Sequence, residues 1–104
     1  MRLLSVLVAL GALTRDVRGL SSGLTPVEDF TTTSGSPDVS MFVYRPEIGD
    51  AMPESPAIVV AIHSCERTAQ YYFQETGYAA LADQHGYMVI YPNASRPGGC
   101  WHVS

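Results

Sequence analysis

Residues 57–62 read AIVVAI and residues 87–91 read YMVIY, and these two stretches decide the fold class. Each is a short, continuous apolar run, which is typical of a strand buried on both faces of a parallel sheet. A helical face is predicted between them from four residues at positions i, i+3, i+4 and i+7: Tyr78, Leu81, Ala82 and His85. Gly86 follows at the position of a left-handed C-cap, and Pro92 is expected to end the second strand. Strand, helix and strand in this order predict a βαβ unit with two parallel, adjacent strands, and therefore an α/β fold.

Two further strands are predicted on the N-terminal side of this unit. Residues 39–45 alternate in character and are rich in β-formers. Residues 24–30 suit a short edge strand, because Pro26 lacks the N–H that a central strand needs. Residues 46–56 hold three prolines and one glycine and predict a loop. Because a single crossover helix leaves sheet edges open and one face uncovered, we expect residues 20–104 to be the N-terminal portion of a larger domain.

Residues 1–19 have the features of a secretory signal peptide. Arg2 precedes the apolar run 3–13, which is too short to span a bilayer. Small residues near Gly19 suit cleavage after it. We therefore expect a secreted, extracellular protein that keeps no membrane attachment once the leader is removed.

The charge of the remaining chain excludes nucleic acid as a default partner. Without residues 1–19, three arginines stand against nine carboxylates, a formal charge of −6, and the sequence has no lysine. Phosphate backbones and anionic membrane surfaces carry the same sign and are disfavoured. The hydrophobic fraction of 46% and the charged fraction of 15% exclude a disordered chain.

The two cysteines are predicted to form a disulfide. A secreted chain meets an oxidising environment, so Cys65 and Cys100 are expected to pair, with about 4 kcal/mol of stabilisation from loop closure. The alternative is a zinc site that adds His63 and His102, but paired zinc ligands are normally spaced by two to four residues rather than one. We expect no metal. Asn93 begins a sequon and is a predicted N-glycosylation site.

No convincing nucleophile is found in the sequence. The pattern G-x-S-x-G occurs once, at residues 19–23, but no strand precedes Ser21 and no helix follows it, as a nucleophile elbow requires. A triad could be assembled in chain order from His63, Asp83 and Ser95, but only spatial evidence could support those roles. We therefore assign no catalytic side chain.

The turn His63-Ser64-Cys65 is the best candidate for a functional backbone group. It follows the strand at 57–62, and sites in open α/β sheets assemble at the carboxyl ends of strands. The amide of Cys65, or of Ser64, could stabilise an oxyanion, and His63 would then hold the turn by hydrogen bonds. The alternative is a plain β-to-α loop. Trp101 is either core packing or an apolar platform for a sugar ring.

Five stretches of the sequence resemble the secreted fungal acetylxylan esterases. They are residues 57–65 (AIVVAIHSC), 68–70 (TAQ), 81–86 (LADQHG), 87–92 (YMVIYP) and 100–101 (CW). These enzymes, with related feruloyl esterases and polyhydroxybutyrate depolymerases, are α/β-hydrolases with a Ser-His-Asp triad and no cofactor. The resemblance covers about residues 24–104 and reaches only the N-terminal portion of the family's domain.

The resemblance implies specific roles for several residues. It places the oxyanion contribution at Cys65 and fits a disulfide to Cys100. The family's nucleophile, aspartate and histidine correspond to positions beyond this chain, so the chain by itself is expected to be inactive. Glu66-Arg67 replace a small polar residue and a glycine, and Arg67 is expected to obstruct a left-handed backbone there. His102 replaces a common aspartate.

The expected function is that of a secreted carboxylic ester hydrolase of the acetylxylan esterase type. Its expected partner is acetylated xylan or a related plant cell-wall polysaccharide. Two alternatives remain open at this point: a non-catalytic secreted module that binds glycans through Trp101, and a chain that does not fold stably.

Overall fold

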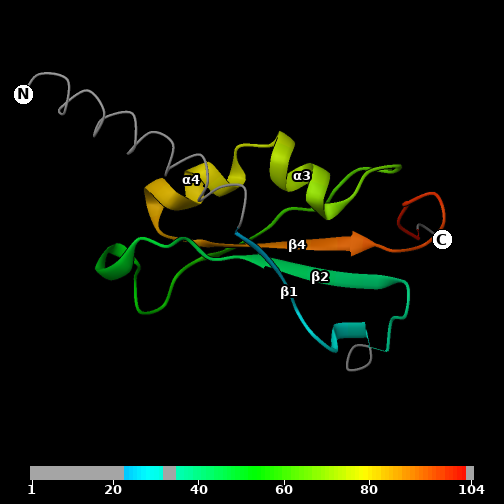
Figure 1. The fold of residues 1–104 in the computed structure, drawn as a ribbon, viewed down its shortest axis with the longest axis horizontal. Coiled ribbons are helices and arrows are strands. Elements are labelled where there is room, and N and C mark those ends of the chain that lie inside the picture. The colour runs from blue at the N-terminus through cyan, green and yellow to red at the C-terminus, as the bar shows by residue number, and fades with distance from the viewer. Residues whose placement is uncertain (1–22, 32–34, 103–104) are drawn as a thin grey trace, which may run out of the picture.

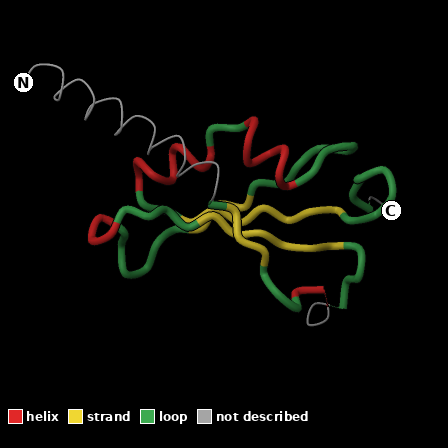
Figure 2. Tube along the Cα trace, in the orientation of Figure 1, coloured by secondary structure: helices red, strands yellow, loops and turns green. Residues whose placement is uncertain are grey.

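The computed structural model describes residues 23–31 and 35–102, and the predicted signal peptide at 1–19 lies outside them. The described residues form a four-stranded mixed sheet in the order β1-β2-β4-β3 (Figures 1 and 2). The strands are β1 (Leu24–Pro26), β2 (Val39–Tyr44), β3 (Ile58–Val60) and β4 (Met88–Ala94). The helices are the short 3-10 helix η1 (Gly49–Ala51), α3 (Ala69–Glu75) and α4 (Tyr78–His85). The predicted α/β class is confirmed.

The predicted βαβ unit is present. Strands β3 and β4 are parallel neighbours, with Val59 opposite Val89. The expectation that Pro92 ends the second strand is wrong, because β4 continues to Ala94. Along β4, Met88 and Ala94 direct their N–H groups toward the β3 side, so Pro92 at the same parity faces that side too. Because it faces away from β2, the missing N–H of Pro92 removes no bond to β2. It removes no bond to β3 either, because β3 ends at Val60, before this level.

The two N-terminal strands extend the sheet with antiparallel pairing. β2 pairs with β4, so that Phe42 lies opposite Tyr91, and β1 pairs with β2 at the edge. The predicted edge strand is therefore confirmed, although only Leu24–Pro26 of residues 24–30 is in the strand. The predicted loop at 46–56 carries only the single turn η1.

The connection between β3 and β4 contains two helices rather than one. The sequence interpretation missed α3, whose N-cap is Thr68, with its Oγ1 accepting a 3.0 Å hydrogen bond from the N–H of Tyr71. Helix α4 begins and ends where predicted. Gly86 is its left-handed C-cap, with φ 71°, and donates to the carbonyl of Ala82 at 2.8 Å.

The core lies between the two helices and one face of the sheet. Its buried side chains include Tyr44, Phe73, Val89 and Tyr91, and the rings of Phe73 and Tyr91 meet edge to face at 5.9 Å. The predicted buried face of α4 is confirmed only at Ala82. Its buried residues are Ala79 and Ala82, whereas Tyr78 and Leu81 are among the exposed large side chains and His85 is also exposed. Small residues at the contact let the helix approach β4 closely.

On the other face of the sheet, three apolar side chains form an exposed row, two from β3 and one from just after its end. Ile58, Val60 and Ile62 are 59%, 54% and 57% exposed. The expectation that this strand is buried on both faces is therefore wrong for the described residues, because α3 and α4 both lie on the opposite side (Figure 1). Within the described ranges, no helix is long and apolar enough to cross a bilayer.

Candidate functional site

The turn that follows β3 is held in a tight conformation. The N–H of Arg67 donates to the carbonyl of Ser64 at 3.2 Å, which closes the turn. The left-handed residue in it is Glu66, with φ 64°, whereas the family resemblance implied that this conformation falls at Arg67. Ser64 and Cys65 are exposed, and their N–H groups make no hydrogen bond to any residue that the structure describes. Two backbone donors are thus available at the carboxyl end of a strand.

His63 fixes this turn from inside the protein. Its side chain is 1% exposed, and its Nε2 accepts a 3.0 Å hydrogen bond from the N–H of Ala94. Because Nε2 is the acceptor, the proton of the neutral ring is on Nδ1, which donates to the carbonyl of Ser64 at 2.8 Å. One imidazole therefore joins β4 to the turn, as the turn-holding interpretation of His63 predicted.

The triad considered from chain order is not assembled. Asp83 lies on α4, where its Oδ1 accepts a 2.7 Å hydrogen bond from the hydroxyl of Tyr44. The Oγ of Ser95 instead lies 3.1 Å from the Oγ of Ser40. With both nitrogens of His63 engaged in structural bonds, the structure does not bring these three residues together as acid, base and nucleophile.

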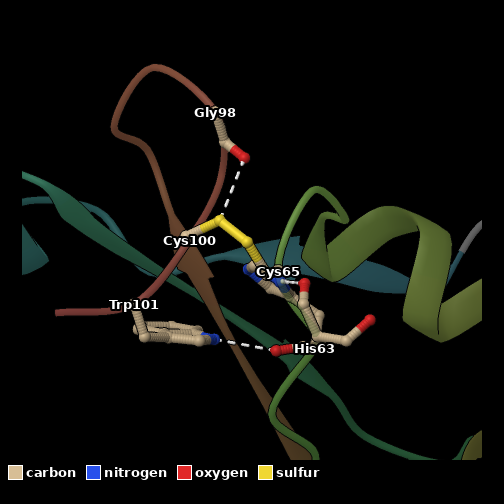
Figure 3. The surroundings of a disulfide bond; sticks show 6 residues. His63, Cys65, Gly98, Cys100 and Trp101 are labelled. Carbon is tan, nitrogen blue, oxygen red and sulfur yellow. Dashed lines mark hydrogen bonds between the residues drawn. A yellow bond between two sulfur atoms is a disulfide. The ribbon is translucent and has the colours of Figure 1, made fainter. Parts of the chain in front are cut away.

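A second connection joins the turn to the loop after β4. Cys65 and Cys100 form a disulfide, and the indole Nε1 of Trp101 donates to the carbonyl of His63 at 2.8 Å (Figure 3). The rings of His63 and Trp101 also pack, with their centroids 4.9 Å apart. The indole of Trp101 therefore packs against His63, and its use as a platform for a sugar ring stays a prediction. The zinc alternative is wrong, because the disulfide consumes both thiols.

Two residues of this region were not recognised from the sequence as structural parts of the site. The side-chain Oδ1 of Asn93 accepts a 2.8 Å hydrogen bond from the N–H of Ala69, which ties the start of α3 to β4. A Cβ on Gly99 would lie 3.0 Å from the carbonyl oxygen of Arg67, so the two loops approach at backbone distance. Gly98-Gly99 before Cys100 is the sequence signal for that close approach. Glycosylation of Asn93 stays a prediction.

A pocket of about 240 Å³ lies beside the disulfide. It is formed by the start of β2 and the loop after β4, and its lining includes Asp38, Val39, Arg96, Cys100, Trp101 and His102. The Nε of Arg96 is 3.9 Å from the Oδ2 of Asp38, in a loose and partly exposed ion pair.

Two buried tyrosines support the sheet beneath the site. Burial, and then the hydrogen bond to Asp83, raises the pKa of Tyr44 above its usual value of 10.0. Burial also raises the pKa of Tyr91 to about 12. The Tyr91 hydroxyl has no hydrogen-bond partner among the residues that the structure describes.

A mixed sheet with a parallel strand pair and helices on one face defines an α/β protein, and in this class ligands generally bind at the carboxyl ends of the strands. The chain matches the family model "Esterase PHB depolymerase" over residues 39–103. It belongs to this esterase family.

Its relatives include fungal acetylxylan esterases. It is 42% identical to acetylxylan esterase A of Aspergillus oryzae, in a match that covers 100% of this chain and 36% of that protein. It is 40% identical to acetylxylan esterase A of Emericella nidulans, over 89% of this chain and 29% of that protein. The solved acetyl xylan esterase from Aspergillus awamori superposes with a TM-score of 0.67 at 40% identity, covering 80% of this chain and 28% of that one. The chain thus spans about a third of the length of these relatives.

Proposed function

We propose that this chain supplies the oxyanion turn of a secreted serine carboxylic ester hydrolase that removes acetyl groups from xylan. The observation that carries the proposal is the pair of N–H groups at Ser64 and Cys65, two exposed residues, which no described residue accepts in a hydrogen bond. The substrate class rests on the names of the relatives, which are acetylxylan esterases. Cleavage of a leader after Gly19 and glycosylation at Asn93 belong to the same proposal.

The turn would act on the charge that develops during acyl transfer. When a serine hydroxyl gives its proton to a base and attacks the acetyl carbonyl, a tetrahedral intermediate with a negative oxygen forms. The C–O bond to the sugar then breaks, the acetyl group stays on the serine, and the sugar oxygen takes up the proton from the base to leave as a hydroxyl. A fixed amide donor to that oxygen contributes about 3–4 kcal/mol of transition-state stabilisation. The bonds made by His63 and the disulfide at Cys65 limit the movement of the turn, so the donors need little reorganisation during the reaction.

The serine nucleophile and its base have no candidates among the described residues. No hydroxyl there is paired with a histidine nitrogen in the way the reaction requires. We therefore expect the 104-residue chain to hydrolyse p-nitrophenyl acetate no faster than buffer. Ser21→Ala is the control, since any turnover that this change removes would make Ser21 the nucleophile and contradict the assignment.

A chimaera tests the proposed role directly. Residues 23–102 of this chain would replace the matching segment of the Aspergillus oryzae esterase, and release of acetate from acetylated xylan would be measured. We expect a chimaera that folds to retain deacetylation. Ser64→Ala in this chimaera keeps the N–H and removes the hydroxyl, so kcat should change by less than about threefold if the backbone amide is the functional group. A folded chimaera without activity would overturn the proposal.

A further inference from the structure

The pocket beside the disulfide has the size and chemistry of a site for one ring. Its volume of about 240 Å³ lies just below the range of about 300–1,000 Å³ that is typical of sites for drug-sized ligands. An aromatic side chain, Trp101, lines it together with the polar side chains of Asp38, Arg96 and His102. A flat apolar surface with polar groups around it matches a sugar ring, which presents C–H groups on its face and hydroxyls at its rim.

Trp101 is held in place before any ligand arrives. Its Nε1 donates to the carbonyl of His63, and its ring packs on the imidazole of His63 (Figure 3). The adjacent Cys100 is fixed by the disulfide to Cys65. A side chain whose rotamer is already fixed loses little entropy on binding, so the contact area of the indole contributes more fully to affinity.

The charges in the pocket favour a neutral polar ligand. Asp38 and Arg96 are of opposite sign, and their 3.9 Å separation is longer than a hydrogen bond. Their side chains keep 58% and 35% of their surface exposed, so each has capacity left for further hydrogen bonds. A carboxylate and a guanidinium together accept from and donate to hydroxyls, whereas an ionic ligand would be repelled by one of them.

The pocket is covalently connected to the proposed oxyanion turn. Cys100 lines the pocket, and its disulfide partner Cys65 is in the turn. A polysaccharide with one sugar in the pocket would therefore place a neighbouring sugar near the amides of Ser64 and Cys65. We propose that this pocket binds an unreacted xylose ring of the xylan main chain, with Trp101 as the stacking surface and Asp38 and Arg96 as its polar contacts. The choice of xylan rests on the function proposed above.

Trp101 is the single tryptophan of the chain and so reports on this pocket. Its fluorescence would be followed while the full chain, first confirmed to melt cooperatively, is titrated with unacetylated xylo-oligosaccharides. We expect a saturable change. Asp38→Asn and Arg96→Gln should each weaken binding about tenfold or more, because each removes hydrogen bonds to a charged group. Arg45→Gln, which changes an exposed arginine outside the pocket lining, should leave Kd unchanged.

Each other outcome would overturn the proposal. The absence of saturation, or equal weakening by Arg45→Gln, would remove the pocket as the binding site. Equal affinity for cello-oligosaccharides would contradict the assignment to xylan. If a variant fails to melt cooperatively, Arg96→Lys, which keeps the charge and loses the planar fork, is measured in its place. Because the ligand carries no ester, failure here leaves the chimaera assay of deacetylation as an independent result.

Discussion

Glu66 adopts a backbone conformation that side chains other than glycine rarely occupy. Its φ is 64°, in the turn that carries the proposed oxyanion donors. For an L-residue the left-handed conformation costs about 1–2 kcal/mol. Glu66→Gly should therefore raise the free energy of unfolding by about 1 kcal/mol, measured by urea titration. Gln74→Gly, on the exposed face of α3, is the matched control and should lower it by about 1 kcal/mol. A decrease for both variants would show that Glu66 is not strained.

Tyr91 contributes a buried hydroxyl without a partner in the described part of the chain, whereas the hydroxyl of Tyr44 donates to Asp83. Tyr91→Phe should stabilise the protein by about 1 kcal/mol, because it removes an unsatisfied polar group. Tyr44→Phe should destabilise it by about 2 kcal/mol, because it removes a hydrogen bond to a charged acceptor. Urea titrations at neutral pH would measure both. Two changes of the same sign would contradict these assignments.

The same tyrosines make stability depend on alkaline pH. The pKa of Tyr91 is about 12 in the folded protein, above its ordinary value of 10.0, so the folded state holds the proton more tightly. The contribution of this pKa difference to the free energy of unfolding is complete below pH 10. As the pH rises from 10 toward 12 the free energy of unfolding falls, by up to about 1.4 kcal/mol per pH unit. Tyr91→Phe should reduce the slope of the free energy of unfolding against pH in this range by the amount that corresponds to about one proton. An unchanged slope would show that Tyr91 does not titrate differently on unfolding.

At the scale of elements, the turn after β3 and the loop after β4 form one unit. A Cβ on Gly99 would lie 3.0 Å from the carbonyl oxygen of Arg67, whereas one on Gly98 would meet nothing within 4 Å. Both glycines have a positive φ, so an alanine at either position carries the strain of a left-handed backbone. Only the alanine at Gly99 would also clash with another residue, and the difference between the two variants therefore measures the steric contact. Gly99→Ala should destabilise the protein by about 1–3 kcal/mol more than Gly98→Ala. Thermal unfolding of both variants checks this, and equal effects would mean that the loops do not approach closely.

The sequence predicted the elements whose signal is local. Apolar runs and the Gly86 C-cap indicated β3, β4 and α4, and the cysteine pair indicated the disulfide. The extent of β4 past Pro92 could not be predicted, because it depends on where the neighbouring strand ends. Helix α3 was missed because its signal is a Thr68 N-cap and only two buried side chains, Ala69 and Phe73.

The site shows the same division between local and long-range information. The position of the turn after a strand and the structural role of His63 followed from the sequence. The pairing of His63 Nε2 with the N–H of Ala94 did not, because it joins residues 31 positions apart. Likewise, helical spacing indicated Tyr78, Leu81, Ala82 and His85 as the buried face of α4, but only Ala82 of these is buried, together with Ala79. Tertiary packing decided which face is buried.

At the scale of the whole molecule, the sheet has an open edge at β3. The carbonyl of Ala57 and the N–H of Ala61 bond to β4, so the alternate residues Ile58 and Val60 direct their backbone groups outward. No described strand pairs with that edge. Their side chains are also more than half exposed. An uncharged, β-branched edge of this kind is a template for pairing with another chain.

We therefore expect the isolated chain to associate as its concentration rises, and Val60→Lys to reduce this association. The lysine places a charge on the edge, where pairing with a second strand would bury it. Because Val60 is 54% exposed, the change should alter the free energy of unfolding by less than about 1 kcal/mol. Sedimentation velocity over a concentration series measures the association. Gln74→Lys, which adds the same charge on α3, should associate like the unmodified chain. If both lysine variants reduce association equally, net charge rather than the β3 edge controls association. If the unmodified chain stays monomeric at every concentration, the β3 edge does not pair with a second chain and the prediction is wrong.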